Sequence, residues 1–88
     1  MIQPEFNLLD TIEQVQLLNE QGVYIGKRRA GNCIAVLYQV EGFYVEIQYN
    51  KYRLHISRIN SSTSTDLLSP YLDQLKIELL LHVEDRVN

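Results

Sequence analysis

Four short segments in which apolar and polar residues alternate occupy the middle of this 88-residue chain. Alternation with a period of two is the pattern of a β-strand that buries one face. The pairs Gly31-Asn32, Glu41-Gly42 and Asn50-Lys51 separate the segments, and each suits a two-residue turn. We therefore predict a four-stranded antiparallel meander with strands at 23–30, 33–40, 43–49 and 52–57.

The apolar positions agree across all four predicted strands. Counting outward from the turns places Tyr38 opposite Val45 and Val36 opposite Ile47 on one face. The same count gives the further pairs Val23 with Val40, Ile25 with Tyr38, Tyr49 with Tyr52, Ile47 with Leu54, and Val45 with Ile56. One face of the sheet is therefore apolar and needs a covering layer.

Residues at helical spacing precede the strands. Leu8, Ile12, Val15 and Leu18 predict a buried stripe on a helix over 7–21. Asp10 with Glu13 forms a capping box within this region, with Asn7 as an alternative cap, and Gly22 suits the helix terminus.

A second helical segment follows the strands. The polar stretch 61–65 predicts a loop that ends in a helix cap at Ser64 or Thr65. Apolar spacing then predicts a helix over 67–75, with Pro70 in its first turn. Residues 77–83 fit either a further helical segment, which we favour, or a short strand.

Together these elements predict one α+β domain over residues 1–88, in the order α-β-β-β-β-α. Both helices need to bury an apolar stripe, so we expect both to pack on the apolar face of the sheet. Lys27 falls on that same face of the first strand, where an inward charge discourages another chain from pairing with the edge.

The other face of the sheet is mixed in character, and we expect it to be open to solvent. Tyr24, Leu37 and Tyr44 give it apolar area, which favours a non-enzymatic protein-interaction module that forms a homodimer through this face. Glu46 is expected beside His55, and Gln48 beside Arg53. The candidate interaction residues are Tyr24, Arg28, Leu37, Gln39, Tyr44, Glu46, Gln48, Arg53 and His55.

The distribution of charge along the chain supports an alternative function, the binding of an anionic partner. Residues 22–60 hold six basic and two acidic residues, whereas residues 1–21 hold four acidic residues and no Lys or Arg. A basic sheet face with tyrosines could bind nucleic acid or another anion weakly through Arg28, Arg53 and His55. The net charge of −3 disfavours nucleic acid. A ligand pocket lined by Tyr38 and Tyr49 between helices and sheet is a third hypothesis.

Catalytic and metal-binding patterns are missing from the sequence. Cys33 is the one cysteine, and His55 and His82 are the two histidines, so no zinc spacing or nucleophile–base motif arises. We expect no catalytic residue, no cofactor and no metal. Neither a signal-peptide pattern nor an apolar run of about 20 residues occurs, so we expect a cytoplasmic protein with no membrane contact.

The stretches 22–25, 37–39, 43–46, 61–66 and 70–72 resemble a group of small bacterial proteins of uncharacterised function. Members of this group share the following elements with the chain: a helix, a Gly-Val-Tyr/Phe strand, a Leu-Tyr-Gln strand, a Phe-Tyr-Val-Glu strand, a Ser/Thr-rich loop and a Pro-Tyr-Leu helix. The short turn Asn50-Lys51 departs from the longer acidic turn of the group. The resemblance implies a bacterial cytoplasmic protein with this fold, and it carries over no catalytic residue or cofactor.

Overall fold

The computed structural model describes residues 1–52 and 55–72, and its N-terminal part consists of two short helices. Helix α1 spans Gln3–Leu8 and α2 spans Thr11–Gln21, in place of the single helix expected over 7–21. The Asp10 carboxylate accepts a hydrogen bond from the backbone N–H of Glu13 at 2.8 Å, and the Glu13 carboxylate accepts one from the backbone N–H of Asp10 at 3.3 Å. The predicted capping box is confirmed, and it starts α2 after the chain has left α1.

Gly22 ends α2 as predicted, although not because of a positive φ. Its φ is −74°, in the ordinary extended region. A Cβ at this position would lie 2.6 Å from the carbonyl oxygen of Leu18, which accepts the Gly22 N–H at 2.9 Å. Close approach of the last helical turn, rather than backbone freedom, therefore requires glycine here.

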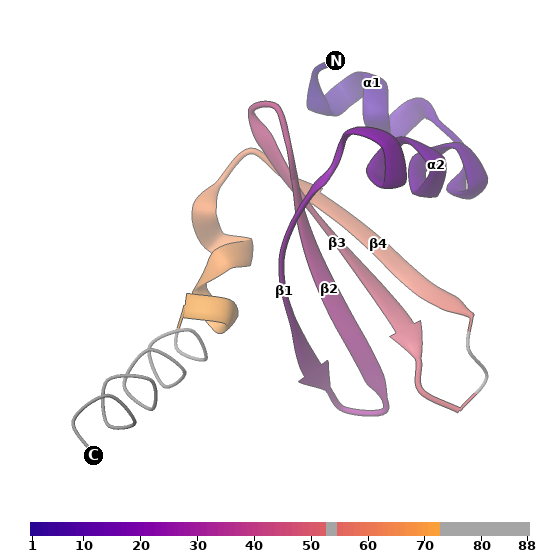
Figure 1. Cartoon of the computed structure of the whole chain (residues 1–88), viewed down its shortest axis with the longest axis vertical. Helices are drawn as coiled ribbons and strands as arrows, with labels where there is room; N and C mark the ends of the chain where they lie inside the picture. The colour runs from indigo at the N-terminus through magenta and orange to yellow at the C-terminus, as the bar shows by residue number, and fades with distance from the viewer. Residues whose placement is uncertain (53–54, 73–88) are drawn as a thin grey trace.

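Four antiparallel strands form one sheet in the order β1-β2-β3-β4, which confirms the α+β class and the meander (Figure 1). The strands are β1 (Val23–Ala30), β2 (Cys33–Val40), β3 (Phe43–Asn50) and β4 (Ile56–Ser62). The register between β2 and β3 is the predicted one, with Tyr38 paired with Val45 and Val36 with Ile47. The turn residue Gly31 has a φ of 60°, as the Gly-first turn requires.

The predicted register at the start of β1 is wrong because the strand contains a bulge. Val23 pairs with Gln39 rather than Val40, and Tyr24 pairs with Tyr38 in the place expected for Ile25. The register shifts between Tyr24 and Gly26. Relative to unbroken alternation, the extra residue reverses the faces of the side chains that precede the bulge, so Tyr24 shares the face of Tyr38 and not the opposite one.

The last strand also differs from the prediction over 52–57. Tyr49 pairs with Ile56 rather than Tyr52, Ile47 pairs with Ile59 rather than Leu54, and Val45 pairs with Ser61 rather than Ile56. The turn is longer than two residues because the Asn50 side chain accepts the backbone N–H of Tyr52 at 2.9 Å. A register shift between Gln48 and Tyr49 lets Ile56 and Ile59, three residues apart, face the same side.

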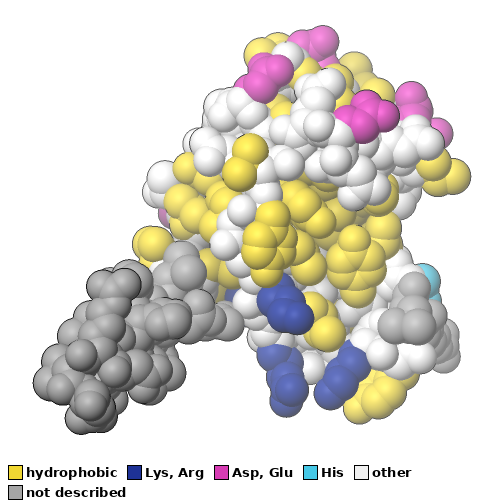
Figure 2. Space-filling model, viewed as in Figure 1, with side chains coloured by type: hydrophobic (Ala, Val, Ile, Leu, Met, Phe, Trp, Pro, Cys, Tyr) yellow, Lys and Arg dark blue, Asp and Glu magenta, His cyan; other side chains and the backbone are white. Residues whose placement is uncertain are grey.

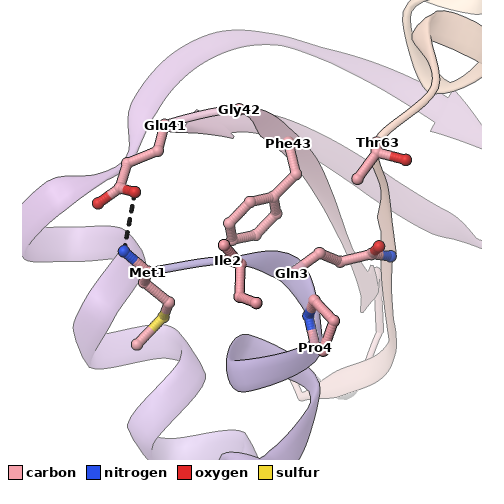
Figure 3. Close-up of a pocket in the computed structure, with 8 residues that line it drawn as sticks. All are labelled: Met1, Ile2, Gln3, Pro4, Glu41, Gly42, Phe43 and Thr63. Atoms are coloured by element: carbon pink, nitrogen blue, oxygen red, sulfur yellow. Dashed lines mark hydrogen bonds and ion pairs between the residues drawn. The ribbon is translucent and has the colours of Figure 1, made fainter.

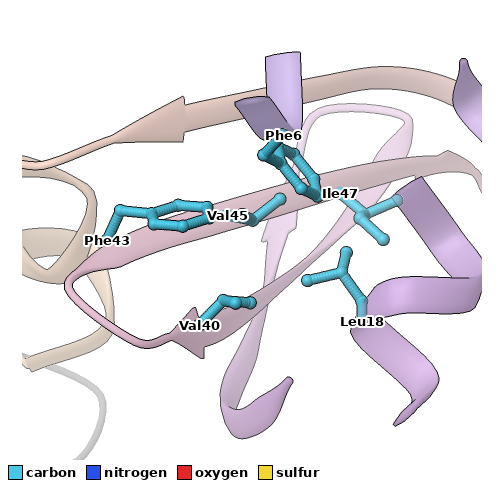
Figure 4. Packing of buried hydrophobic residues seen from close by; sticks show 6 residues of the cluster. All are labelled: Phe6, Leu18, Val40, Phe43, Val45 and Ile47. Atoms are coloured by element: carbon cyan, nitrogen blue, oxygen red, sulfur yellow. The ribbon is translucent and has the colours of Figure 1, made fainter. Parts of the chain in front are cut away.

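The hydrophobic core lies between the two N-terminal helices and one end of the sheet (Figure 4). Phe6 of α1 and Leu18 of α2 reach the sheet, and the Phe6 and Phe43 ring centroids are 5.6 Å apart. Leu8 and Ile12, expected in the buried stripe, are instead 87% and 71% exposed. The buried cluster consists of Phe6, Leu18, Val40, Phe43, Val45 and Ile47.

The C-terminal described segment covers the opposite face, so the expected placement of both helices on one face is wrong. Ser64 caps a 3-10 turn, η1 (Thr65–Leu68), as predicted, and residues 69–72 are helical. Tyr71 lies against Gly26 and donates a hydrogen bond to Glu46. The strand register places both Gly26 and Glu46 on the side of the sheet away from the core cluster. The rest of the predicted helix 67–75, and the segment 77–83, lie outside the described residues.

Candidate interaction surface

Five apolar side chains on the helix-bearing face remain at least partly exposed. We call this set the open strip, and it consists of Tyr24, Ile34, Val36, Tyr38 and Tyr49. Register places all five on the same side of β1, β2 and β3. Tyr24 is 57% exposed and the other four are half-buried. Figure 2 shows hydrophobic side chains across the middle of this side of the molecule.

The tyrosines of the open strip form a connected aromatic surface. The Tyr24 and Tyr38 ring centroids are 6.3 Å apart in an edge-to-face arrangement, which aromatic pairs favour. Burial, and to a smaller extent the neighbouring Tyr38, raises the pKa of Tyr49 above its ordinary value. The Tyr49 phenol therefore stays neutral near pH 7, and the strip contains no Lys, Arg, Asp or Glu, so this part of the face suits an apolar contact.

A cationic groove adjoins the open strip at the end of β1. Lys27, Arg28, Arg29 and Ile34 line it, and its volume is about 420 Å³. Lys27 pairs with Val36 and Arg29 with Ile34, so both of these cations share the face of the strip, and both are exposed. We call this the basic groove. It is open, and the described residues that line it include no acidic side chain, so it suits an anionic group.

The helix pair at the other end of this face is acidic. Glu5, Asp10, Glu13 and Glu20 are all exposed, and residues 1–22 contain no Lys or Arg. Figure 2 shows the acidic side chains gathered over this end and the Lys and Arg side chains at the other, with the hydrophobic area between them. The helix-bearing face therefore has an acidic end, an apolar middle and a basic end.

The opposite face carries a buried polar cluster around Glu46. The Tyr71 hydroxyl donates to the Glu46 carboxylate at 2.8 Å, Gln48 donates at 3.1 Å, and the Arg28 guanidinium lies 3.4 Å from the carboxylate oxygens. The Arg28 guanidinium also lies 5.6 Å from the centroid of the Tyr71 ring. Burial, followed by the bond to Glu46, raises the pKa of Tyr71 above its ordinary value. This cluster fixes residues 65–72 to the sheet.

That segment changes the position of the interaction face expected from the sequence. Leu37 is fully buried and Glu46 is 2% exposed, so neither lies on an open surface. Tyr24 lies on the helix-bearing face, His55 is exposed in the turn, and Arg53 is outside the described residues. The remaining candidates on the opposite face are Gln39, which is exposed, and Arg28, Tyr44 and Gln48, which are half-buried.

The expected polar pairs across β3 and β4 do not form. Glu46 pairs with Asn60 rather than His55, and Gln48 pairs with Arg58 rather than Arg53. Both differences follow from the later start of β4, which moves every partner along the strand. The structure thus brings Arg28, Glu46 and Gln48 together and separates them from His55.

A small pocket lies where the start of the chain meets the turn between β2 and β3 (Figure 3). Its volume is about 220 Å³, and the amino group of Met1 donates to Glu41 at 2.8 Å on its rim. This volume is below the roughly 300–1,000 Å³ typical of small-molecule sites. The residues that line it are Met1, Ile2, Gln3, Pro4, Glu41, Gly42, Phe43 and Thr63, and not the expected Tyr38 and Tyr49.

The described residues offer little for catalysis or metal binding. Within residues 1–52 and 55–72, no group of three His, Cys, Asp or Glu side chains is placed to hold a metal ion. The Cys33 thiol lies 3.7 Å from the Ser57 hydroxyl. In the same part of the chain, no helix has the length and apolar character needed to span a membrane.

The sequence did not single out the open strip, because alternation assigned four of its residues to the covered apolar face and Tyr24 to the opposite face. Helix length was the available signal. An 11-residue helix is about 16 Å long, whereas an eight-residue strand is about 26 Å long, so even the longer helix leaves one end of the face uncovered.

No family model, curated protein or solved structure matches this chain.

Proposed function

We propose that this protein is a non-enzymatic protein-interaction module, and that a second copy of the chain covers its open strip. The observation that carries the proposal is the open strip itself, in which Tyr38 and Tyr49 pack against the core cluster but stay partly exposed and Tyr24 is exposed. Grouped apolar area of this kind marks an interaction surface. We further propose that the protein acts in the cytoplasm.

Charge favours a second copy as the partner. The open strip is bordered by acidic helices on one side and by Lys27 and Arg29 on the other. A surface with acidic groups at one end, an apolar middle and basic groups at the other end is complementary to itself when one copy is turned by a half rotation. A partner of a single charge sign would match only one border.

Adjacent residues of β1 provide a matched pair of variants. Tyr24→Glu places a charge on the open strip, and Val23→Glu places the same charge on the opposite face. The two wild-type side chains are similarly exposed, 57% and 62%. Mass measured by light scattering across a wide concentration range should give twice 10.3 kDa for wild type and for Val23→Glu. Tyr24→Glu should raise the dimer dissociation constant about 30-fold, as for a central interface aromatic worth about 2 kcal/mol.

Two outcomes would refute self-association through the strip. One is a wild-type mass of a single chain at every concentration, and the other is an equal effect of the two substitutions. Circular dichroism of both variants checks that each has folded before its mass is interpreted.

The nucleic-acid hypothesis is tested with the same proteins, because Lys27 and Arg29 share a face of the sheet with the three tyrosines of the open strip. A fluorescent single-stranded RNA 12-mer is titrated at low and high salt. Phosphate contacts would make binding fall steeply with salt, and stacking on the strip would make it sensitive to Tyr24→Glu. We expect no salt-sensitive binding; binding by a monomeric protein would replace our proposal.

A further inference from the structure

The helix pair makes the helix-bearing face higher at one end than at the other, and we call this difference in height the step. One end of the sheet carries α1 and α2 as a second layer, and the end with the open strip and the basic groove has no such layer among the described residues (Figure 1). A helix layer is about 10 Å thick. A partner surface can therefore contact the open strip only if it projects by about that distance.

We propose that two copies interlock in opposite directions, so that α1 and α2 of each copy lie on the open strip of the other. The inference rests on the proposed self-association and adds its geometry. The helix pair has the thickness that the step requires, and the resulting assembly has three layers: one sheet, the two helix pairs side by side, and the second sheet.

Exposed apolar residues on the helices support this arrangement. Phe6 and Leu18 point into the protein's own core, whereas Leu8 is 87% exposed and Ile12 is 71% exposed. A helix pair that met only solvent on its outer side would gain nothing from these side chains. In the interlocked dimer they contact the tyrosines and Val36 of the partner copy.

The area of an ordinary dimer interface also favours a contact that includes the helix pair. A stable dimer buries about 800 Å² on each copy, which is about an eighth of the 6,313 Å² that this chain exposes. Five side chains, four of them half-buried, supply only part of that area. The helix pair and the basic groove supply the rest when both lie in the contact.

Shape and charge both reject the other two-fold arrangement of the same faces. If the two copies ran in the same direction, helix pair would meet helix pair and the open strips would be held apart. Acidic side chains such as Glu13 and Glu20 would then face their own copies, as would Lys27 and Arg29. In the opposite direction, the acidic helices of each copy meet the basic groove of the other.

A charge exchange tests the geometry. The first variant, Lys27→Glu with Arg29→Glu, makes the basic end acidic. The second, Gln16→Lys with Glu20→Lys, changes the net charge of residues 1–21 from −4 to −1 and places two cations on α2; both side chains are exposed and neither belongs to a capping box. The third combines all four substitutions in one chain. Dissociation constants are measured by sedimentation equilibrium at 50 mM and 500 mM NaCl.

We expect each two-residue variant to dissociate at least about tenfold more readily than wild type at low salt. The first variant places carboxylates against the acidic helices of the partner copy, and the second removes most of the helix charge and places cations against the partner's Lys27 and Arg29. The four-residue variant should bind more tightly than either two-residue variant, because its new cations on α2 then face the new carboxylates of the partner copy. The wild-type dimer should weaken as salt rises, since screening removes the attraction.

Other outcomes overturn the interlocked geometry and leave self-association standing. These are a wild-type dimer that strengthens with salt, or a four-residue variant that stays as weak as the two-residue variants. A wild-type chain that is monomeric at both salt concentrations refutes the proposed function itself. Leu8→Glu gives an independent readout: it should weaken the dimer about tenfold or more without changing the helix content, and unchanged affinity would contradict the contact.

Discussion

The hydroxyl of Tyr71 holds the C-terminal described segment on the sheet, and its removal in Tyr71→Phe should lower stability measurably. The hydroxyl donates to the buried Glu46 carboxylate at 2.8 Å, the shortest of the hydrogen bonds that this carboxylate receives from described residues. Hydrogen bonds to charged groups contribute about 1.5–3 kcal/mol. Phenylalanine keeps the ring against Gly26 and Arg28, so the loss isolates the hydroxyl.

We expect Tyr71→Phe to reduce the free energy of unfolding by about 2 kcal/mol. For a domain of this size, that corresponds to a fall of about 8–16 °C in the melting temperature. Urea unfolding followed by circular dichroism measures the first quantity, and a thermal scan measures the second. Tyr44→Phe is the control, because Tyr44 is half-buried on the same face and its hydroxyl has no hydrogen bond with the described residues.

Coupling with Glu46 decides whether the hydrogen bond is responsible. In the Glu46→Gln background the hydroxyl meets a neutral acceptor, so Tyr71→Phe should cost less there than in wild type. A loss below about 0.5 kcal/mol in wild type, or an equal loss in both backgrounds, would refute the conclusion that this bond fixes residues 65–72 to the sheet.

Three further predictions concern the caps and the alkaline limit of stability. Asp10→Ala removes the acceptor of the Glu13 N–H and should cost about 1 kcal/mol, with a loss of helix signal in circular dichroism; no loss would mean that the cap is dispensable. Gly22→Ala should destabilise by more than about 1 kcal/mol in urea unfolding, because its Cβ would lie 2.6 Å from the Leu18 carbonyl oxygen; a neutral effect would show that the backbone can shift there. Folding raises the pKa of Tyr71 above its value of 10.0 in the unfolded chain, so its contribution is complete below about pH 10 and is lost as the pH rises further. Stability should fall above pH 10, and it should fall less in Tyr71→Phe; parallel pH curves would exclude this residue.

The centre of the sheet was predictable because its register depends on local chemistry. Gly31-Asn32 and Glu41-Gly42 each form a tight turn, and two-residue turns fix the pairing of the strands that they join. Alternation then assigns each side chain to a face without further information. The capping box of Asp10 with Glu13 was predictable for the same reason, since both partners lie within four residues of each other.

Bulges were not predictable from alternation. The shift between Tyr24 and Gly26 moves Tyr24 to the helix-bearing face, and the shift beside Tyr49 lets Ile56 and Ile59 face the same side. A bulge adds one residue to one strand and leaves the apolar pattern on either side intact. The pairing and the face of a residue therefore change at each shift without a signal in the sequence pattern.

The choice of face by residues 65–72 explains where the candidate site lies. Ala35 and Leu37 alternate with the core residues and are both fully buried, so the sheet has apolar area to cover on each side. Tyr71 covers the side away from the core, and its hydroxyl satisfies Glu46, which a wholly apolar segment would leave buried without that bond. With this segment on that side, α1 and α2 are the elements of the described residues that cover the other face, and they are too short for its length. The surface left for a partner is therefore the far end of the helix-bearing face, where Lys27 and Arg29 border the open strip.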